Sequence, residues 1–167
     1  MISVTERFLN VCRRFNPKVI YDCGSLHALD GLHLLENLQA EELHIFECNP
    51  DNVKKCKENI SAYKGKGRIF VNELAVADRD GEINFYPIDT EKTFTTHANG
   101  NPGASSLLIA NPDYPNEKYV QKKIKVKCTT LDTYASSHRM SDILWMDLQG
   151  AEMMAFRGGG GVSKMQR

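Results

Sequence analysis

The chain has 167 residues, of which 41% are hydrophobic and 25% charged, as is typical of a single globular domain. Lysine plus arginine and aspartate plus glutamate both total 21, and this zero formal net charge argues against a general nucleic-acid binder. The sequence holds neither an apolar run of about 20 residues that would span a membrane nor the apolar core of a secretory signal.

The first half of the chain alternates helical and strand patterns. Hydrophobic spacing predicts a helix over residues 3–15, a strand over 18–23 and a helix carrying leucines between 26 and 38. A strand over 41–47 follows, then a helix with Asn49 as its N-cap and Pro50 in its first turn, then a strand over 68–74. This order predicts an α/β fold with a mostly parallel sheet and right-handed crossovers.

The pattern changes after residue 74. Asp80-Gly81 indicates a tight turn between the apolar segments 74–76 and 83–86. The polar stretch 89–117 is too long for a simple connection, so we expect either a functional loop or partial disorder. A strand over 124–128, whose alternating lysines suggest a solvent-facing side, is followed by a short helix from residue 130 and a strand over 142–147.

Acidic residues stand where three predicted strands end. Asp22 is followed by Gly24 and a helix, Glu47 comes about 25 residues later, and Asp147 ends the last strand. Carboxyl ends of parallel strands share one edge of the sheet, so these positions predict a nucleotide pocket. Each acid also has a simpler explanation: Asp22 as a helix cap, Glu47 as a solvent-facing strand end, and Asp147 as a helix-entry acid.

The five cysteines are scattered, with neither CxxC spacing nor histidines at a zinc-finger interval. They predict free thiols in a reducing compartment, and therefore a cytoplasmic protein. The five histidines do not cluster either. We expect no metal site.

Several motifs together resemble the FkbM-type family of class I S-adenosylmethionine-dependent methyltransferases. The most specific are Phe46-Glu47-Cys48-Asn49-Pro50 and the block from Met146 to Glu152. The resemblance also includes the block from Asp22 to Ser25, Ala75-Val76-Ala77-Asp78 with Gly81, Ser105-Ser106-Leu107 and Thr130-Leu131-Asp132, and so covers about residues 18 to 158.

The resemblance implies a Rossmann-like sheet that binds S-adenosylmethionine and transfers its methyl group to a hydroxyl of a small molecule or sugar. It implies that Glu47 holds the ribose, that Gly24 and Ser25 face the amino-acid end, and that Asp147 lies beside the sulfonium. The remaining expected cofactor contacts are Asp22, Cys48, Glu73, Leu74 and Ala75, the base is Asp147 or Glu152, and the expected substrate contacts are His97, Ser105 and Ser106.

The sequence also departs from the family pattern. Leu26 and Ala28 stand where further glycines are common, and Gln149 and Trp145 replace the usual acid and lysine of the last block. The alternative function is a non-catalytic nucleotide-binding or scaffold domain that retains the fold after truncation. A nicotinamide dehydrogenase is disfavoured because Gly24 lacks the partner glycines of G-x-G-x-x-G.

The end of the chain predicts a truncated fold. We expect one methyltransferase-like domain over residues 1–157, an unpacked Gly-rich tail over 158–167, and a sheet that lacks the family's C-terminal strands. The uncovered sheet edge would favour a homo-oligomer. Acceptor specificity is expected to lie in the 89–117 loop and in those absent elements.

Overall fold

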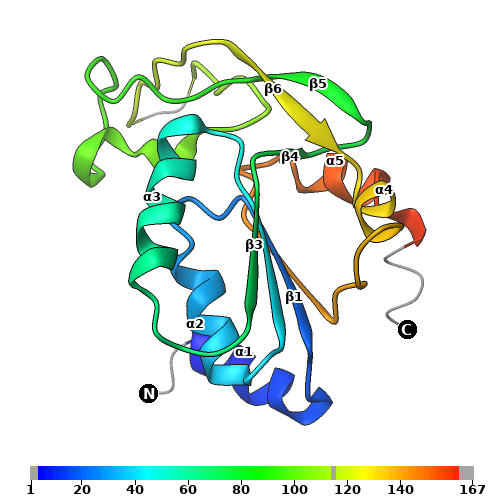
Figure 1. Ribbon diagram of the computed structural model, residues 1–167. Helices are drawn as coiled ribbons and strands as arrows, with labels where there is room; N and C mark the ends of the chain where they lie inside the picture. The colour runs from blue at the N-terminus through cyan, green and yellow to red at the C-terminus, as the bar shows by residue number, and fades with distance from the viewer. Residues whose placement is uncertain (1–3, 114–115, 162–167) are drawn as a thin grey trace.

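The computed structural model describes residues 4–113 and 116–161. Its centre is a four-stranded sheet in the order β3-β2-β1-β7, in which every neighbouring pair runs parallel (Figure 1). This confirms the predicted α/β fold with a parallel sheet. The strands are β1 (Val19–Cys23), β2 (Glu42–Phe46), β3 (Arg68–Asn72) and β7 (Ile143–Met146).

Helices cover both faces of this sheet, which gives three layers (Figure 1). One face packs against α1 (Val4–Cys12), α2 (Leu29–Leu38) and α3 (Pro50–Ala62), with a short 3-10 turn, η1 (Arg13–Phe15), after α1. The other face packs against α4 (Leu131–Ala135) and α5 (Glu152–Arg157).

The two central strands are buried at all five positions, as expected for parallel strands that are covered on both sides. Successive side chains point to opposite faces, so each strand contributes side chains to two hydrophobic cores. Ile20 and Leu43 join the core under α1, α2 and α3, whereas Tyr21 and Phe46 join the core under α4 and α5. The carboxyl ends of β1 and β2 are therefore held by packing from both sides.

Helix starts follow the capping chemistry of the sequence. The Asn49 side chain accepts a hydrogen bond from the backbone N–H of Asp51 at 3.2 Å, and Pro50 is the first residue of α3, as predicted. Helix α2 begins only at Leu29, after a turn in which Leu26 and Ala28 both have positive φ. Leu29 is 59% exposed, and the buried leucines of α2 are Leu32, Leu34, Leu35 and Leu38.

A second sheet of three strands lies above the first and has the order β4-β6-β5: β4 (Ala75–Val76), β5 (Gly81–Phe85) and β6 (Ile124–Thr129). The expected Asp80-Gly81 turn therefore does not join two paired strands, because β6 lies between β4 and β5. Asp80 instead accepts hydrogen bonds from the backbone N–H of Thr130 and the hydroxyl of Thr133, and so stabilises the start of α4.

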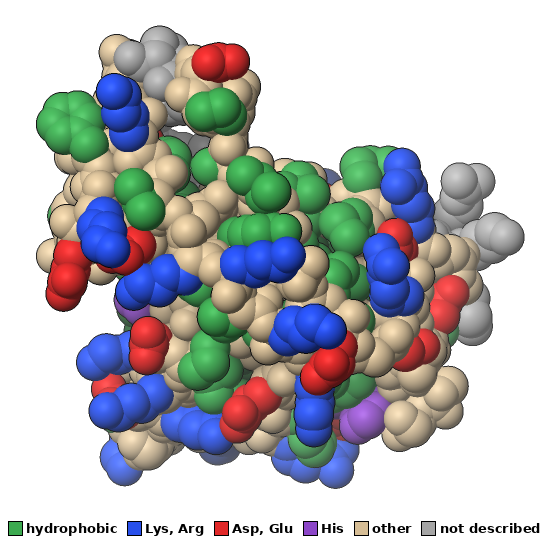
Figure 2. All heavy atoms as spheres, turned by 90° about the horizontal axis from the view of Figure 1, so that it is seen from above, with side chains coloured by type: hydrophobic (Ala, Val, Ile, Leu, Met, Phe, Trp, Pro, Cys, Tyr) green, Lys and Arg blue, Asp and Glu red, His purple; other side chains and the backbone are tan. Residues whose placement is uncertain are grey.

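The lysines of β6 face solvent, as the alternation predicted. Lys125 and Lys127 are exposed, while Ile124 and Val126 between them are half-buried. Figure 2 shows this upper face, where basic side chains are interspersed with hydrophobic and acidic ones. Such a mixed surface is not the continuous basic patch of a nucleic-acid interface.

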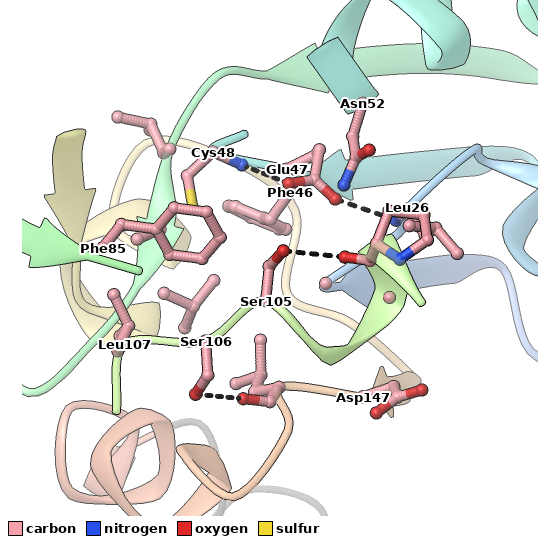
Figure 3. A pocket seen from close by; sticks show the side chains of 17 residues that line it. Leu26, Phe46, Glu47, Cys48, Asn52, Phe85, Ser105, Ser106, Leu107 and Asp147 are labelled. Atoms are coloured by element: carbon pink, nitrogen blue, oxygen red, sulfur yellow. Dashed lines mark hydrogen bonds between the residues drawn. The ribbon is translucent and has the colours of Figure 1, made fainter. Parts of the chain in front are cut away.

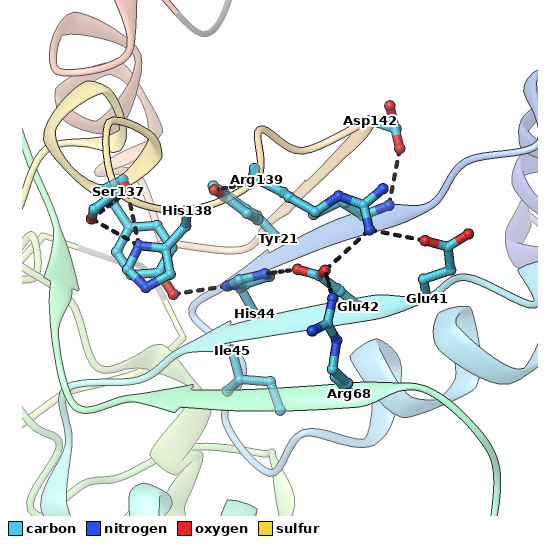
Figure 4. Close-up of polar contacts among 12 residues, drawn as sticks. Tyr21, Glu41, Glu42, His44, Ile45, Arg68, Ser137, His138, Arg139 and Asp142 are labelled. Carbon is cyan, nitrogen blue, oxygen red and sulfur yellow. Dashed lines mark hydrogen bonds and ion pairs between the residues drawn. The ribbon is translucent and has the colours of Figure 1, made fainter.

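A buried polar network lies in the lower half of the sheet (Figure 4). Glu42 is buried and receives hydrogen bonds from Arg68 and Arg139. His44 lies between Glu42, at 3.1 Å from Nε2, and the Tyr134 hydroxyl, at 2.8 Å from Nδ1. Burial lowers the pKa of His44. The network ties β2 to β3 and α4, away from the carboxyl ends of the strands.

The end of the described chain packs further than we expected. Gly158 and Gly159 are buried, and the Gly158 carbonyl accepts the backbone N–H of Asp132 at 3.1 Å. The N–H of Gly161 donates to the Asp132 carboxylate at 2.9 Å. Packed structure thus extends beyond the predicted boundary at 157 to residue 161, and residues 162–167 lie outside the described part.

Two further features concern the described residues alone. No strand among them pairs with the second edge of β7. None of their helices has the length and apolar character needed to cross a membrane.

All five cysteines are free, as predicted, and the cytoplasmic location stays a prediction.

Candidate functional site

A pocket opens at the carboxyl edge of the parallel sheet, between that edge, the small sheet and the long loop (Figure 3). It contains about 500 Å³ of empty space, part of it open to solvent. Its lining residues are Gly24, Leu26, Phe46, Glu47, Cys48, Asn52, Leu74, Ala75, Val76, Phe85, Pro102, Gly103, Ser105, Ser106, Leu107, Asp147 and Leu148.

Glu47 is the buried acid of this pocket. Its carboxylate accepts backbone N–H groups from Leu26 at 2.9 Å, Cys48 at 2.9 Å and Asn49 at 2.8 Å. Burial raises the pKa of Glu47, and these hydrogen bonds oppose that shift by stabilising the charged form. The side chain of Asn52 points toward Glu47 from the first turn of α3 (Figure 3). The strand end, the glycine turn and α3 therefore meet at one carboxylate.

The turn after β1 passes close to the end of β7. Gly24 has φ +82°, and a Cβ there would lie 2.1 Å from the backbone oxygen of Asp147. Only glycine tolerates both this conformation and this contact. Leu26, two residues on, has φ +53° and directs its N–H to Glu47. The turn thus places backbone atoms, rather than side chains, next to the acid.

Apolar side chains form the opposite side of the pocket. Phe46 and Phe85 are buried, and Figure 3 draws Phe46 beside Glu47 and Phe85 farther from it. Leu74, Val76 and Leu107 complete a slot between the two sheets. An aromatic ring system buried against these side chains would gain hydrophobic free energy without needing a charged partner.

Asp22 and Ser25 lie beneath the pocket and do not line it. Both are buried, and the Ser25 hydroxyl donates a hydrogen bond to the Asp22 carboxylate. Burial raises the pKa of Asp22 to about 7, against the Ser25 hydroxyl and the Gly31 N–H, which lower it. A Cβ at Gly31 would lie 2.6 Å from Asp22 Oδ2, so Asp22 packs directly against α2. Its place in the structure is the joint between β1 and α2.

Asp147 lies where the pocket meets a second, more open cavity. The two cavities share Gly24, Leu26, Gly103, Ser106 and Asp147. The Asp147 side chain is exposed and accepts a hydrogen bond from the Gln149 amide, while its backbone N–H donates to Cys23 O at 3.0 Å. Gln149 also lines the second cavity. A solvent-accessible carboxylate therefore stands at the boundary of two spaces.

Two other expected acids lie elsewhere. Glu152 lines neither cavity, and its carboxylate accepts the backbone N–H of Leu148 at 2.8 Å, which orders the loop after β7. Glu73 is exposed and forms an ion pair with Lys57 on α3, at 2.5 Å. Among the expected cofactor residues at this strand end, Leu74 and Ala75 line the pocket and Glu73 does not.

The expected substrate residues divide between the cavities. His97 lines only the second cavity, and Ser105 only the first. Ser106 lines both and donates to Gln149 O at 3.0 Å, which fastens the long loop to the loop after β7. The Ser105 hydroxyl donates to Pro102 O at 2.7 Å and accepts the N–H of Ile88 at 3.0 Å. Residues of the 89–117 stretch thus line both cavities.

Some lining residues were missed by sequence reasoning. Phe85 and Leu107 belong to segments whose approach to the sheet depends on distant pairing, so no local pattern marks them. The sequence marks Asn52 only weakly: it is a polar residue on the buried side of α3, and a buried polar side chain requires a hydrogen-bond partner. Leu26 was expected in the helix and noted as a departure from glycine, but it lies before α2 and lines the pocket.

Two comparisons with known proteins bear on this site. A family model described as "Methyltransferase FkbM domain" matches residues 22–166. The 2-O-methyltransferase NoeI of Sinorhizobium fredii (strain NBRC 101917 / NGR234) is 28% identical over 168 residues. That alignment covers 95% of this chain and 63% of NoeI, so the chain spans less than two thirds of the relative's length.

Proposed function

This chain belongs to the FkbM methyltransferase family, and from that premise we propose that it binds S-adenosylmethionine and methylates a hydroxyl group of a small molecule or sugar. The observation that carries the proposal is Glu47, a buried carboxylate at the end of β2 that faces an apolar slot. The similarity to a protein named as a 2-O-methyltransferase supports oxygen as the acceptor atom.

The residues of the first pocket fit the proposed cofactor. A carboxylate offers about four acceptor positions. At Glu47 three backbone N–H groups occupy three of them, and the Asn52 side chain also hydrogen-bonds to the carboxylate. The ribose hydroxyls would bind beside Glu47 and the Asn52 amide. The slot between Phe46, Phe85 and Leu107 would take the adenine, and the turn at Gly24 the amino-acid end.

S-adenosylmethionine, when bound, supplies a methyl group made electrophilic by a positively charged sulfur. The chain contributes mainly position, because displacement needs the acceptor oxygen, the methyl carbon and the sulfur in line. Asp147, at the boundary of the two cavities, is the proposed base that accepts the hydroxyl proton as the oxygen forms its new bond to carbon. Gln149 orients its carboxylate through the hydrogen bond to Oδ1. No metal is needed for this reaction.

The proposal is tested by titrating the chain with S-adenosylhomocysteine in a calorimeter, with NAD as the control ligand. We expect selective binding of S-adenosylhomocysteine at a one-to-one ratio. Binding accompanied by no methyl transfer to any hydroxylated acceptor would support the alternative, a non-catalytic nucleotide-binding domain. A folded chain that binds neither ligand would contradict the proposal.

A further inference from the structure

The second cavity is bounded by the long loop and by the loop after β7. It contains about 1,410 Å³ of space that is open to solvent, and it meets the first pocket at Gly24, Ser106 and Asp147. A molecule lying in it would have access to Asp147, which lines both cavities. The residues that line this cavity therefore indicate which acceptor molecules the chain can bind.

The charged side chains of this lining are acidic, apart from a histidine that lies beside one of them. Glu117 and Asp147 are its carboxylates, His97 is its one imidazole, and neither lysine nor arginine is among the described residues that line it. The remaining polar groups are the amides of Asn101, Asn111, Gln121 and Gln149 and the hydroxyls of Ser106 and Tyr119. Like charges at short range repel, so this cavity disfavours carboxylated or phosphorylated molecules.

Glu117 is held firmly in place. Its side chain is buried and accepts hydrogen bonds from the Tyr119 hydroxyl and from Thr95 Oγ1 at 2.9 Å, while His97 Nε2 lies 3.5 Å away. The Tyr119 oxygen in turn accepts the Asn101 amide at 2.8 Å. The hydrogen bond from Tyr119 lowers the pKa of Glu117, which keeps the carboxylate charged at neutral pH.

An apolar segment also lines the cavity. Leu108 is 43% exposed and Ile109 is 71% exposed, and Ala110 follows them. Gln121 fixes this segment, since its side chain accepts the N–H of Ala110 at 2.8 Å and donates to Leu108 O at 3.3 Å. Exposed aliphatic side chains next to fixed acceptors suit a ligand that has both a C–H face and a rim of hydroxyls.

We propose that the second cavity is an acceptor site for uncharged, polyhydroxylated molecules of the sugar class, and that Glu117 determines specificity by excluding anionic ones. The inference rests on the proposed methyltransferase function and deepens it. Hydroxyls would donate to Glu117 and the amides, while the C–H face would lie on Leu108 and Ile109. Glu117 acts in binding, and Asp147 remains the proposed base.

The experiment measures binding of paired probes by saturation-transfer NMR in the presence of S-adenosylhomocysteine. The probes are methyl hexopyranosides of gluco, galacto and manno configuration and the corresponding methyl hexopyranosiduronic acids. At least one neutral glycoside should bind about tenfold more tightly than its uronic acid, the effect of one like charge at roughly 8 Å and an effective dielectric constant near 30. Glu117→Gln should remove most of this difference, and Glu36→Gln, on an exposed part of α2, should leave it unchanged.

A second variant keeps the proposal testable if Glu117→Gln does not fold. Ile109→Lys adds a cation at an exposed position of the same cavity, and it should shift the preference toward the uronic acid. Uronic acids that bind the parent chain as tightly as the neutral glycosides would overturn the proposal, as would a folded Glu117→Gln with unchanged discrimination. So would S-adenosylhomocysteine binding with no glycoside bound. Absence of S-adenosylhomocysteine binding would instead overturn the proposed function.

Discussion

At the scale of single residues, Glu47 and Asp147 have different surroundings and should respond differently to mutation. Glu47 is buried within the proposed ribose site, whereas Asp147 is exposed at the boundary of the cavities. Hydrogen bonds to charged groups contribute about 1.5–3 kcal/mol each. We therefore expect Glu47→Ala to weaken S-adenosylhomocysteine binding at least tenfold, and Asp147→Ala to weaken it less than about threefold, both measured by calorimetry.

Loss of binding must be separated from loss of folding, because Glu47→Ala also leaves three backbone N–H groups without their acceptor. Binding should be measured well below the melting temperature of each variant, with circular dichroism to establish folding. Equal losses in the two variants, or a folded Glu47→Ala that binds normally, would count against the ribose placement.

Asp22 should make stability depend on pH. Its folded pKa of about 7 lies above the unfolded value of about 3.9, so folding takes up a proton between these values. The stabilising contribution of protonated Asp22 is full below pH 4 and is lost as the pH rises toward 7. One proton corresponds to a slope of about 1.4 kcal/mol per pH unit.

The measurement is the free energy of unfolding in urea, from pH 4 to 8, for the parent chain and Asp22→Asn. His44 has a lowered pKa and therefore opposite linkage, as stability is lost when the pH falls below its unfolded value near 6.5. The difference between the two curves removes this shared contribution. Parallel curves would show that Asp22 is ionised throughout the range.

At the scale of elements, the turn between β1 and α2 contains strained backbone. Ala28 has φ +66° and is buried, and left-handed conformations cost non-glycine residues about 1–2 kcal/mol. Glycine loses more chain entropy on folding, about 0.5–1 kcal/mol, so Ala28→Gly should raise the free energy of unfolding by about 0.5–1 kcal/mol. Urea denaturation should show a higher midpoint at unchanged slope.

The matched control is Ala62→Gly at the exposed end of α3, where the backbone is helical. The same change there should lower stability by about 0.5–1 kcal/mol. If both substitutions destabilise the chain equally, the turn is not strained.

The elements of the parallel sheet could be predicted because their signals are local. Apolar runs marked β1, β2 and β7, and Asn49-Pro50 marked the start of α3. The small sheet could not be predicted, since β6 pairs with both β4 and β5 across about 40 residues of intervening loop, and no local pattern records that pairing. Hydrophobic spacing over residues 3–15 identified α1, whose buried residues are Leu9 and Cys12, while Val11 is exposed.

The candidate site divides in the same way into residues that local signals predict and residues that depend on long-range packing. Glu47, Gly24 and Asp147 follow from strand ends, which a parallel sheet must bring together. Asp22 occupies such a strand end too, but the alternation of side chains turns it toward α2 and away from the pocket. The apolar slot and Glu117 depend on how the long loop folds back over the sheet, which tertiary packing decides.

At the scale of the whole molecule, the first pocket joins segments that are far apart in the chain. Its lining includes the turn at residues 24–26, the strand end at 46–48 and the loop at 102–107. Ligand binding stabilises the state in which all three are together, by about 2.7 kcal/mol at a hundredfold excess over Kd. We expect S-adenosylhomocysteine to slow amide hydrogen exchange in all three segments at once, as measured by mass spectrometry.

Protection confined to one segment would contradict this arrangement. The lower half of β2, around the His44 network, lies outside both cavities and serves as the reference for global unfolding. Exchange there should be slow without ligand and should slow further only by the overall stabilisation that ligand binding provides.

The position of β7 also has a consequence for synthesis. Strand β1 gains its second neighbour only from β7, and the Asp142 carboxylate accepts the backbone N–H groups of Lys18 and Val19, more than 120 residues earlier. On the ribosome, the β1-β2-β3 half emerges long before this partner does. Its apolar face around Tyr21 remains exposed to solvent until α4 and β7 have been synthesised. A nascent chain stalled before residue 140 would therefore depend on chaperones.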